Sequence, residues 1–207
     1  MASPVTHIVL TDKVFNKYFP GHDRKKFFIG TSFPDIRYYD NMDREETHPD
    51  GKTLAAIIKE DSFSAGLHFH ALLDKKWGAF YYQQRSQPAF ISSWHVFGTA
   101  LKFFQDELFY ERFGGWASVS SFFDDILEEE KSFDPDLSEE DIRGWHGRLQ
   151  KYFAQKPNEE TRRFSLVDNE ATGDFLKQVN VFIEQMRANK EITESLNDFY
   201  DKFESLF

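Results

Sequence analysis

The 207-residue sequence predicts an all-α fold, a single helical domain arranged as a multi-helix bundle. Apolar residues recur at helical spacing along nearly the whole chain, and no stretch alternates apolar and polar residues between hairpin signals, as a half-buried strand does. The length suits one domain with a substantial core. The 24 phenylalanines supply large side chains to fill that core.

Residues that start or stop helices bound the predicted helices of the first half. Asp23, Ser62 and Ser92 are predicted N-caps because their side-chain oxygens can accept hydrogen bonds from free backbone amides. Proline or glycine after residues 19 and 113 predicts helix ends there. Four helices are therefore expected, at about residues 6–19, 24–29, 63–82 and 93–113. Between the second and third, loops are expected over residues 30–40 and 40–52.

The second half predicts further amphipathic helices. Ser138 begins the segment SEED, which is typical of a capping box at the start of a helix. Asp168 is the predicted cap of the next helix, and residues 118–131 form another amphipathic stretch with an acidic end. Three helices are expected in addition, at about residues 139–153, at about 170–188, and from Thr193 onward.

Composition excludes several classes of site. The net charge of −10, from 25 Lys+Arg against 35 Asp+Glu, argues against a broad nucleic-acid or anionic-lipid surface. Because the chain has no cysteine, any metal site must use histidine and carboxylate ligands. No signal peptide or transmembrane segment is recognisable, so a cytoplasmic location is expected. The oligomeric state cannot be predicted from the sequence.

The histidines are unevenly distributed. Six of the seven lie in the first 95 residues, and the second half has only His146. This split predicts that residues 1–95 carry a metal site and that residues 96–207 form supporting helices.

The segment GLHFHALLD places His70 and Asp74 four residues apart, so both lie on one face of a helix and can reach one ion. His68, about 200° around the helix from His70, points elsewhere. Gly66 lies one turn before His70, where a missing side chain lets another element or an ion approach. About one such His–acid pair is expected by chance from this composition, so a surface hydrogen bond is an equally good interpretation of the pair alone.

Together with three other segments, this helix resembles a known family. The four segments are, in order, VTHIVL, GTSFPDIRYY, ETHPDG and GLHFHALLD. They are similar to the zinc-dependent phospholipase C superfamily, which includes phospholipase C and single-strand nuclease-like metal hydrolases. Its all-helical enzymes share an early helical histidine, a G-x-x-x-PD(I) turn, a loop histidine and a G-x-x-x-H-x-x-x-D helix. The resemblance covers about the first half of the chain.

The resemblance implies a site and a substrate class. It marks as metal ligands His7, Asp35, His48, His70 and Asp74. Asp35 is either a ligand or the base that orients the attacking water, and Pro34 limits the backbone freedom before it. The implied cofactor is Zn²⁺, as one or two ions, or another divalent metal. The implied substrate is a small-molecule or lipid-headgroup phosphoester.

The sequence also departs from the family. The family's enzymes use an N-terminal tryptophan as a ligand, whereas this chain begins MASP. They also have a histidine shortly after the H-x-x-x-D aspartate and a later H-x-x-x-E, but neither His95 nor His146 has an acid at plus four. We therefore expect no third zinc site, and either one metal or two that share a carboxylate.

The predicted function is metal-dependent hydrolysis of a phosphoester through metal-activated water. One alternative is a non-catalytic helical interaction protein with a structural or vestigial metal site, whose C-terminal helices form a partner surface. Another is an HD-type phosphohydrolase, in which His22 and Asp23 would be ligands. His95 is the reserve ligand, and Arg37 is expected either to pair with a substrate phosphate or to support the loop.

Overall fold

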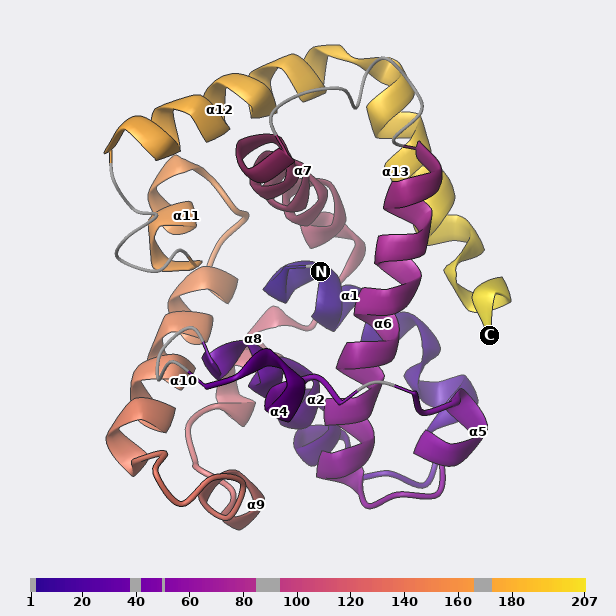
Figure 1. Ribbon diagram of the computed structural model, residues 1–207, viewed down its shortest axis with the longest axis vertical. Helices are drawn as coiled ribbons and strands as arrows, with labels where there is room; N and C mark the ends of the chain where they lie inside the picture. Colours follow the sequence, from indigo (N-terminus) through magenta and orange to yellow (C-terminus); the bar gives the residue numbers. More distant parts are fainter. Residues whose placement is uncertain (1–2, 38–41, 50, 85–93, 166–172) are drawn as a thin grey trace.

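Helix α1, which spans Pro4–Tyr18, runs through the middle of the molecule and is buried over most of its length (Figure 1). The structure is a computed structural model that describes residues 3–37, 42–49, 51–84, 94–165 and 173–207. These residues form α-helices and short 3-10 helices without any strand, which confirms the predicted all-α fold.

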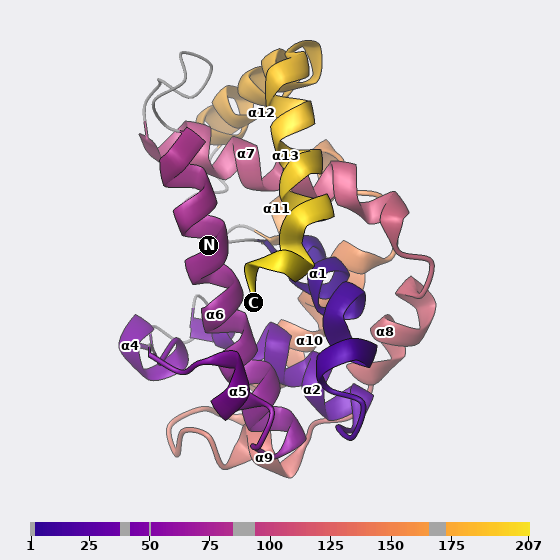
Figure 2. The same cartoon turned by 90° about the vertical axis from the view of Figure 1, so that its right-hand side faces the viewer.

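The rest of the first half contains one long helix and several short ones. They are α2 (Arg24–Ser32), the 3-10 helix η1 (Phe33–Ile36), α4 (Arg44–Thr47), α5 (Leu54–Ile57) and α6 (Ser62–Gln84). Helix α2 packs closely along the first part of α6, and α1 packs against α2 on its other side (Figure 2). This three-helix arrangement, together with η1 and α4, carries the segments that the sequence marks as a site.

Two glycines allow α2 and α6 to approach closely. A Cβ atom on Gly30 would lie 2.2 Å from the carbonyl oxygen of Phe63, and one on Gly66 would lie 2.1 Å from that of Phe27. Real Cβ atoms do not come this close, so any larger residue at either position would force the helices apart. The expectation that Gly66 lets another element approach is therefore confirmed, and that element is α2.

The second half surrounds α1 with further helices. They are α7 (Trp94–Phe109), η3 (Tyr110–Arg112), α8 (Trp116–Phe122), α9 (Glu128–Lys131), α10 (Glu139–Phe153), α11 (Glu159–Ser165), α12 (Gly173–Ala188), α13 (Lys190–Lys202) and η4 (Phe203–Leu206). Helix α12 packs across α7, and Phe199 of α13 contacts Phe80 of α6 at a ring distance of 4.7 Å. The apolar faces of α12 and α13 face the core, where residues such as Ile183 and Leu196 are buried.

Two predicted helix starts are confirmed and others are corrected. The Asp23 side chain accepts a hydrogen bond from the Lys26 amide, and Ser138 forms the predicted capping box with Asp141. Ser62 is not the cap of α6. Instead, the side chain of Asp61 accepts hydrogen bonds from the Phe63 and Ser64 amides, which places the helix start one residue earlier.

Several predicted boundaries were wrong. The loop expected from residue 30 is helical as far as residue 37, since α2 continues to Ser32 and η1 follows directly. The polar loop after it contains α4, and the stretch 118–131 is divided between α8 and α9. The last helix begins at Lys190, three residues before the predicted start, because Asn189 caps it. Helix α11 was not predicted.

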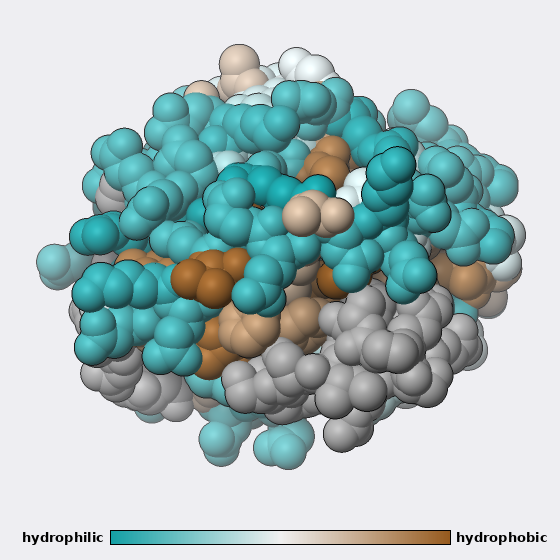
Figure 3. Space-filling model, turned by 90° about the horizontal axis from the view of Figure 1, so that it is seen from above, coloured by the Kyte–Doolittle hydropathy of each residue, from teal (hydrophilic) through white to brown (hydrophobic). Residues whose placement is uncertain are grey.

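Two of the predicted caps, Ser92 and Asp168, fall outside the described residues. Within the described ranges, no helix is both long and apolar enough to cross a membrane. Hydrophilic side chains cover most of the surface at the α12 end, with small separate hydrophobic patches (Figure 3). Among described residues, large hydrophobic side chains are exposed at Ile58, Tyr82 and Val181.

Candidate metal centre

The five residues that the resemblance marks as ligands lie together in the core. His7 is on α1, Asp35 on η1, His48 directly after α4, and His70 and Asp74 on α6. All are buried, with at most 9% of the residue exposed. Their nitrogen and oxygen atoms form two groups in which every atom lies within 4.8 Å of the others: one has His7, His70 and Asp74, and the other has Asp35, His48 and His70. We call these five residues the His/Asp cluster.

His7 is positioned by a contact between two segments that lie 100 residues apart in the sequence. Ser3, the residue before α1, makes no capping hydrogen bond through its side chain to the first turn. Asp106 of α7 does so instead, and accepts hydrogen bonds from the Val5 amide at 3.3 Å and from the Thr6 amide and hydroxyl, each at 2.7 Å. Tyr152 donates a further hydrogen bond at 2.9 Å. Burial raises the pKa of Asp106, and these donors offset part of that effect.

His70 is fixed by the close approach of α2. Its Nδ1 lies 2.7 Å from the carbonyl oxygen of Thr31, so Nδ1 carries the proton and donates it to that oxygen. Thr31 follows Gly30, and His70 lies one turn after Gly66, so the glycine crossing brings this donor and acceptor together. The tautomer leaves Nε2 of His70 as an acceptor that faces the cluster.

His48 and His7 are oriented like His70, with Nδ1 facing an oxygen atom. Nδ1 of His48 lies 2.8 Å from the hydroxyl oxygen of Thr47, and Nδ1 of His7 lies 3.2 Å from the carbonyl oxygen of Ser3. In each case the outer nitrogen is anchored and Nε2 points inward. Nε2 of His7 has no hydrogen-bond partner among the described atoms, although Oδ1 of Asp74 lies 3.5 Å away. Metal-binding histidines are commonly oriented in this way.

The inward nitrogens of His48 and His70 lie within hydrogen-bond distance of each other, and the tautomer of His48 decides what holds them there. Nε2 of His48 lies 3.1 Å from Nε2 of His70. When both Nδ1 atoms carry the protons, these two atoms present lone pairs to each other. If instead the Thr47 hydroxyl donates to Nδ1 of His48, Nε2–H of His48 donates a hydrogen bond to Nε2 of His70; with both Nδ1 atoms protonated, the contact becomes favourable when a cation lies between the two rings. A proton can play this role, as can a metal ion.

Burial disfavours the proton. Burial, together with the neighbouring His70 and Arg44, lowers the pKa of His48 from its ordinary 6.5 to about 2. Burial and the neighbouring His7 lower the pKa of His70 to about 4. Both rings are therefore neutral at pH 7, which is the form that binds metal.

Asp74 is the central carboxylate of the cluster. Its Oδ2 lies 3.7 Å from Nε2 of His48 and 3.9 Å from Nε2 of His70, while its Oδ1 faces His7. Burial alone would raise the pKa of Asp74. The interactions with His7 and His70 contribute to holding it well below its ordinary value. Asp74 is therefore ionised at neutral pH.

The distances fit ligands of one ion. Atoms held about 2.0–2.2 Å from a tetrahedral ion lie about 3.3–3.6 Å apart. Around Nε2 of His48, the cluster atoms of His70, Asp74 and Asp35 lie at 3.1, 3.7 and 3.8 Å. His48, His70 and Asp74, whose ligand atoms lie 3.1–3.9 Å from one another, can therefore hold a metal ion after small side-chain movements, and Asp35 lies beside His48.

His7 is placed differently from the other four. Its ring stacks on that of His70 with 3.9 Å between centroids and 5° between planes, so one ion cannot lie in the planes of both rings. The Nε2 atom of His70 has a single lone pair and cannot bridge two ions. If two ions bind, His7 belongs to a second site, and the carboxylate of Asp74 is the group that both can share.

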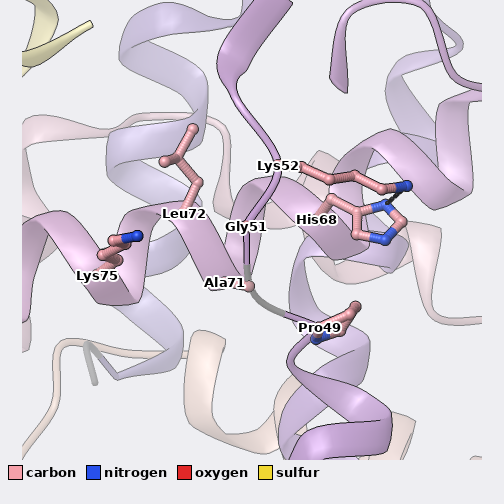
Figure 4. A pocket seen from close by; sticks show the side chains of 7 residues that line it. All are labelled: Pro49, Gly51, Lys52, His68, Ala71, Leu72 and Lys75. Carbon is pink, nitrogen blue, oxygen red and sulfur yellow. Dashed lines mark hydrogen bonds between the residues drawn. The ribbon is translucent and has the colours of Figure 1, made fainter. Parts of the chain in front are cut away.

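The structure keeps the other candidate histidines away from both groups. His68 lies on another side of α6, where its Nδ1 faces Lys52 at 3.4 Å, beside a shallow pocket (Figure 4). Nε2 of His22 lies 3.2 Å from the carbonyl oxygen of Glu60, and Asp23 caps α2. His95 is exposed and its ring lies 5.2 Å from that of Phe175. His146 pairs with Glu130 elsewhere in the core.

Two arginines lie close to the cluster. Arg37, at the end of η1, is half-buried and contributes to the lowered pKa of His48. Arg44, which the sequence analysis did not select, places Nη2 3.3 Å from Oδ2 of Asp74. Asp106 and the carbonyl of Thr31 were also missed, because their partners lie 100 and 39 residues away in the sequence.

Comparison with protein-family models, curated proteins and solved structures found no match for this chain.

Proposed function

We propose that the protein is a metal-dependent hydrolase that cleaves a phosphoester bond at the His/Asp cluster. The observation that carries this proposal is the convergence of histidine nitrogens and buried carboxylates, with Nε2 of His48 3.1 Å from Nε2 of His70 in rings whose lowered pKa values keep both neutral. The mixture of imidazole and carboxylate ligands suits a zinc-type ion. Asp35, His48, His70 and Asp74 would hold the first ion. His7 and Asp74 would contribute to a second.

When bound, a zinc-type ion polarises the phosphoester and makes water acidic enough to attack near neutral pH. Asp35 is the candidate general base. Its side chain is 13% exposed, whereas those of His48, His70 and Asp74 are 1–4% exposed. It therefore has the best access to water and substrate, and its carboxylate can orient a water molecule and accept its proton.

The arginines near the cluster support a phosphoester rather than a neutral substrate. Arg44 contacts Asp74, and Arg37 lies two residues beyond Asp35. Guanidinium groups bind phosphate oxygens with two parallel hydrogen bonds. They give a local positive charge within a chain whose net charge is −10.

A second candidate function is a structural metal site in a non-catalytic protein, and the burial of all five cluster residues favours it. The amphipathic helices α12 and α13 give that candidate little surface for a partner, since their apolar faces are buried in the core. The HD-type alternative receives no support from the position of His22, which is bound to the Glu60 carbonyl.

The proposal is tested by assaying zinc-reconstituted protein on p-nitrophenyl phosphate and bis-p-nitrophenyl phosphate. We expect turnover that chelator removes and zinc restores. Asp35→Asn should lower kcat by about 100- to 10,000-fold while helix content and zinc content stay unchanged. Asp43→Asn, which makes the same chemical change at an exposed position, is the matched control.

Two results would contradict the proposal. A zinc-loaded wild type that melts at a higher temperature but hydrolyses neither compound would favour the structural metal site. Full activity in Asp35→Asn would remove Asp35 from the mechanism.

A further inference from the structure

Arg44 occupies a special position at the edge of the His/Asp cluster. It is the first residue of α4, and its side chain is 44% exposed, while that of its partner Asp74 is 4% exposed. The guanidinium therefore reaches from solvent to a buried carboxylate. An arginine side chain is always protonated, so this contact places a permanent positive charge beside the cluster.

Arg44 contacts the same oxygen that a metal ion needs. Nη2 of Arg44 lies 3.3 Å from Oδ2 of Asp74, and that oxygen faces Nε2 of His48 at 3.7 Å and Nε2 of His70 at 3.9 Å. A divalent ion held by these atoms would lie close to the guanidinium. Because two positive charges at this separation repel each other, the ion and Arg44 compete for Asp74.

Once displaced, Arg44 cannot move far from the site. It lies four residues before His48, one turn of helix away, and its carbonyl oxygen accepts a 2.8 Å hydrogen bond from the His48 amide. The backbone position of Arg44 is therefore tied to that of a cluster residue. Its guanidinium then remains at the solvent-facing edge of the cluster, within reach of an anion that binds there.

We propose that Arg44 is the residue that binds the phosphoryl group of the substrate, and that metal binding releases it from Asp74 for this role. The proposal rests on the function proposed above, and it specifies an anionic phosphate group as the ligand class. In the metal-free protein, Arg44 compensates the charge of Asp74. In the metal-loaded protein the ion takes over that role, so metal and phosphate bind with positive coupling.

This arrangement predicts opposite effects of one substitution on two ligands. In Arg44→Gln, zinc no longer competes with the guanidinium, so zinc affinity stays equal or rises. Phosphate affinity of the zinc-loaded protein falls about ten- to a hundredfold, the loss expected for charged hydrogen bonds. Arg44→Lys keeps the charge but loses the paired hydrogen bonds, and should give an intermediate phosphate affinity.

The experiment is isothermal titration of full-length protein, first with zinc and then with submillimolar inorganic phosphate, for wild type, both Arg44 variants and Arg143→Gln. Arg143 is an arginine on α10 whose side chain is 64% exposed and pairs with Glu139, so it serves as a control for general charge effects. Phosphate should bind zinc-loaded wild type and Arg143→Gln equally, and metal-free protein more weakly.

The outcomes separate this inference from the proposed function. If wild type binds zinc and phosphate but Arg44→Gln binds phosphate equally well, the role of Arg44 is wrong and the metal site stands. A fall in zinc affinity in Arg44→Gln would also overturn it, because Arg44 would then support the metal rather than compete with it. If wild type binds no zinc, both proposals fail.

Discussion

The part of the chain that the structure describes contains two buried histidine–carboxylate assemblies, and they differ in how completely their hydrogen-bonding groups are used. In the second half, Nδ1 of His146 lies 3.2 Å from the carbonyl oxygen of Phe123, and its Nε2 lies 2.8 Å from Oε1 of Glu130. Oε2 of Glu130 accepts a hydrogen bond from the Leu127 amide at 2.9 Å. Both ring nitrogens of this pair have partners.

The His/Asp cluster is different because Nε2 of His7 has no hydrogen-bond partner among the described atoms. The outer nitrogens of His7, His48 and His70 face oxygen atoms, but the Nε2 atoms converge on one another and on two carboxylates. Burial of a histidine is therefore not enough to indicate a site. Convergence of anchored rings with unused lone pairs is the feature that points to a bound cation.

The largest effect on stability is expected at the His146 pair. Glu130→Ala should lower the free energy of unfolding by about 3–5 kcal/mol, because it removes one partner of a buried charged or hydrogen-bonded pair. Zinc content should not change. Glu128→Ala, on the same helix but with an 83% exposed side chain, should cost less than about 1 kcal/mol. Urea denaturation of the metal-free proteins measures both, and a loss of zinc in Glu130→Ala would break the distinction between the two assemblies.

The next effect concerns the helix crossing that builds the cluster. Gly66→Ala places a Cβ 2.1 Å from the Phe27 carbonyl oxygen, so α2 must move and carry Thr31 away from His70. We expect a loss of about 3 kcal/mol and weaker zinc binding. Gly78→Ala is the control on the same helix, where the new methyl group meets nothing within 4 Å. It should be neutral or gain up to about 1 kcal/mol from helix propensity.

Thermal melting with and without zinc distinguishes the two glycine variants. If Gly66→Ala melts like wild type and retains its zinc affinity, the crossing does not set the geometry of the cluster.

A smaller, pH-dependent effect should appear in the metal-free protein. The pKa of His70 is about 4 and that of His48 is about 2 in the folded state, against an ordinary value of 6.5. Well above pH 6.5 both histidines are neutral in the folded and in the unfolded state, and their contribution to stability is complete. As pH falls from 6.5, the unfolded chain takes up protons that the folded protein cannot. Stability should therefore fall by up to about 1.4 kcal/mol per pH unit for each ring.

Single histidine substitutions separate the contribution of the histidines to the pH dependence of stability from that of the carboxylates. Unfolding free energies of wild type and His48→Gln between pH 7 and 5 should show a shallower pH dependence for the variant, while the exposed His95→Gln should follow wild type. Equal slopes for all three proteins would mean that His48 takes up its proton as readily in the folded as in the unfolded state.

The same comparison explains what the sequence could predict. Helical periodicity and local caps such as Asp23 and Ser138 act within a few residues, so they were predicted correctly. The cluster residues were also found, because each lies in a short segment with a recognisable spacing. By contrast, the Asp106 cap of α1 and the His146–Glu130 pair depend on tertiary contacts between segments 100 and 16 residues apart. Local sequence carries no signal for such pairings.

Some predicted helix boundaries were wrong for a similar reason. Residues 30–37 read as a loop because glycine and proline lie within them, yet Gly30 serves a helix crossing and Pro34 lies in the first turn of η1, where it is tolerated. Arg44 was overlooked because its partner Asp74 is 30 residues away and its own segment is polar throughout. The sequence thus indicated the residues of the His/Asp cluster better than the groups that position them.

The most direct test of the central claim is the metal content of dialysed protein after reconstitution with zinc, measured by elemental analysis for wild type, His70→Ala and His68→Ala. His68 is two residues from His70 on α6 but lies outside the cluster, so its variant controls for the loss of a histidine from this helix. The expected result is one or two equivalents of metal in wild type and in His68→Ala, and none in a still helical His70→Ala. Wild type that takes up no metal, or a His70→Ala variant that retains it in full, would contradict the assignment of the His/Asp cluster as a metal centre.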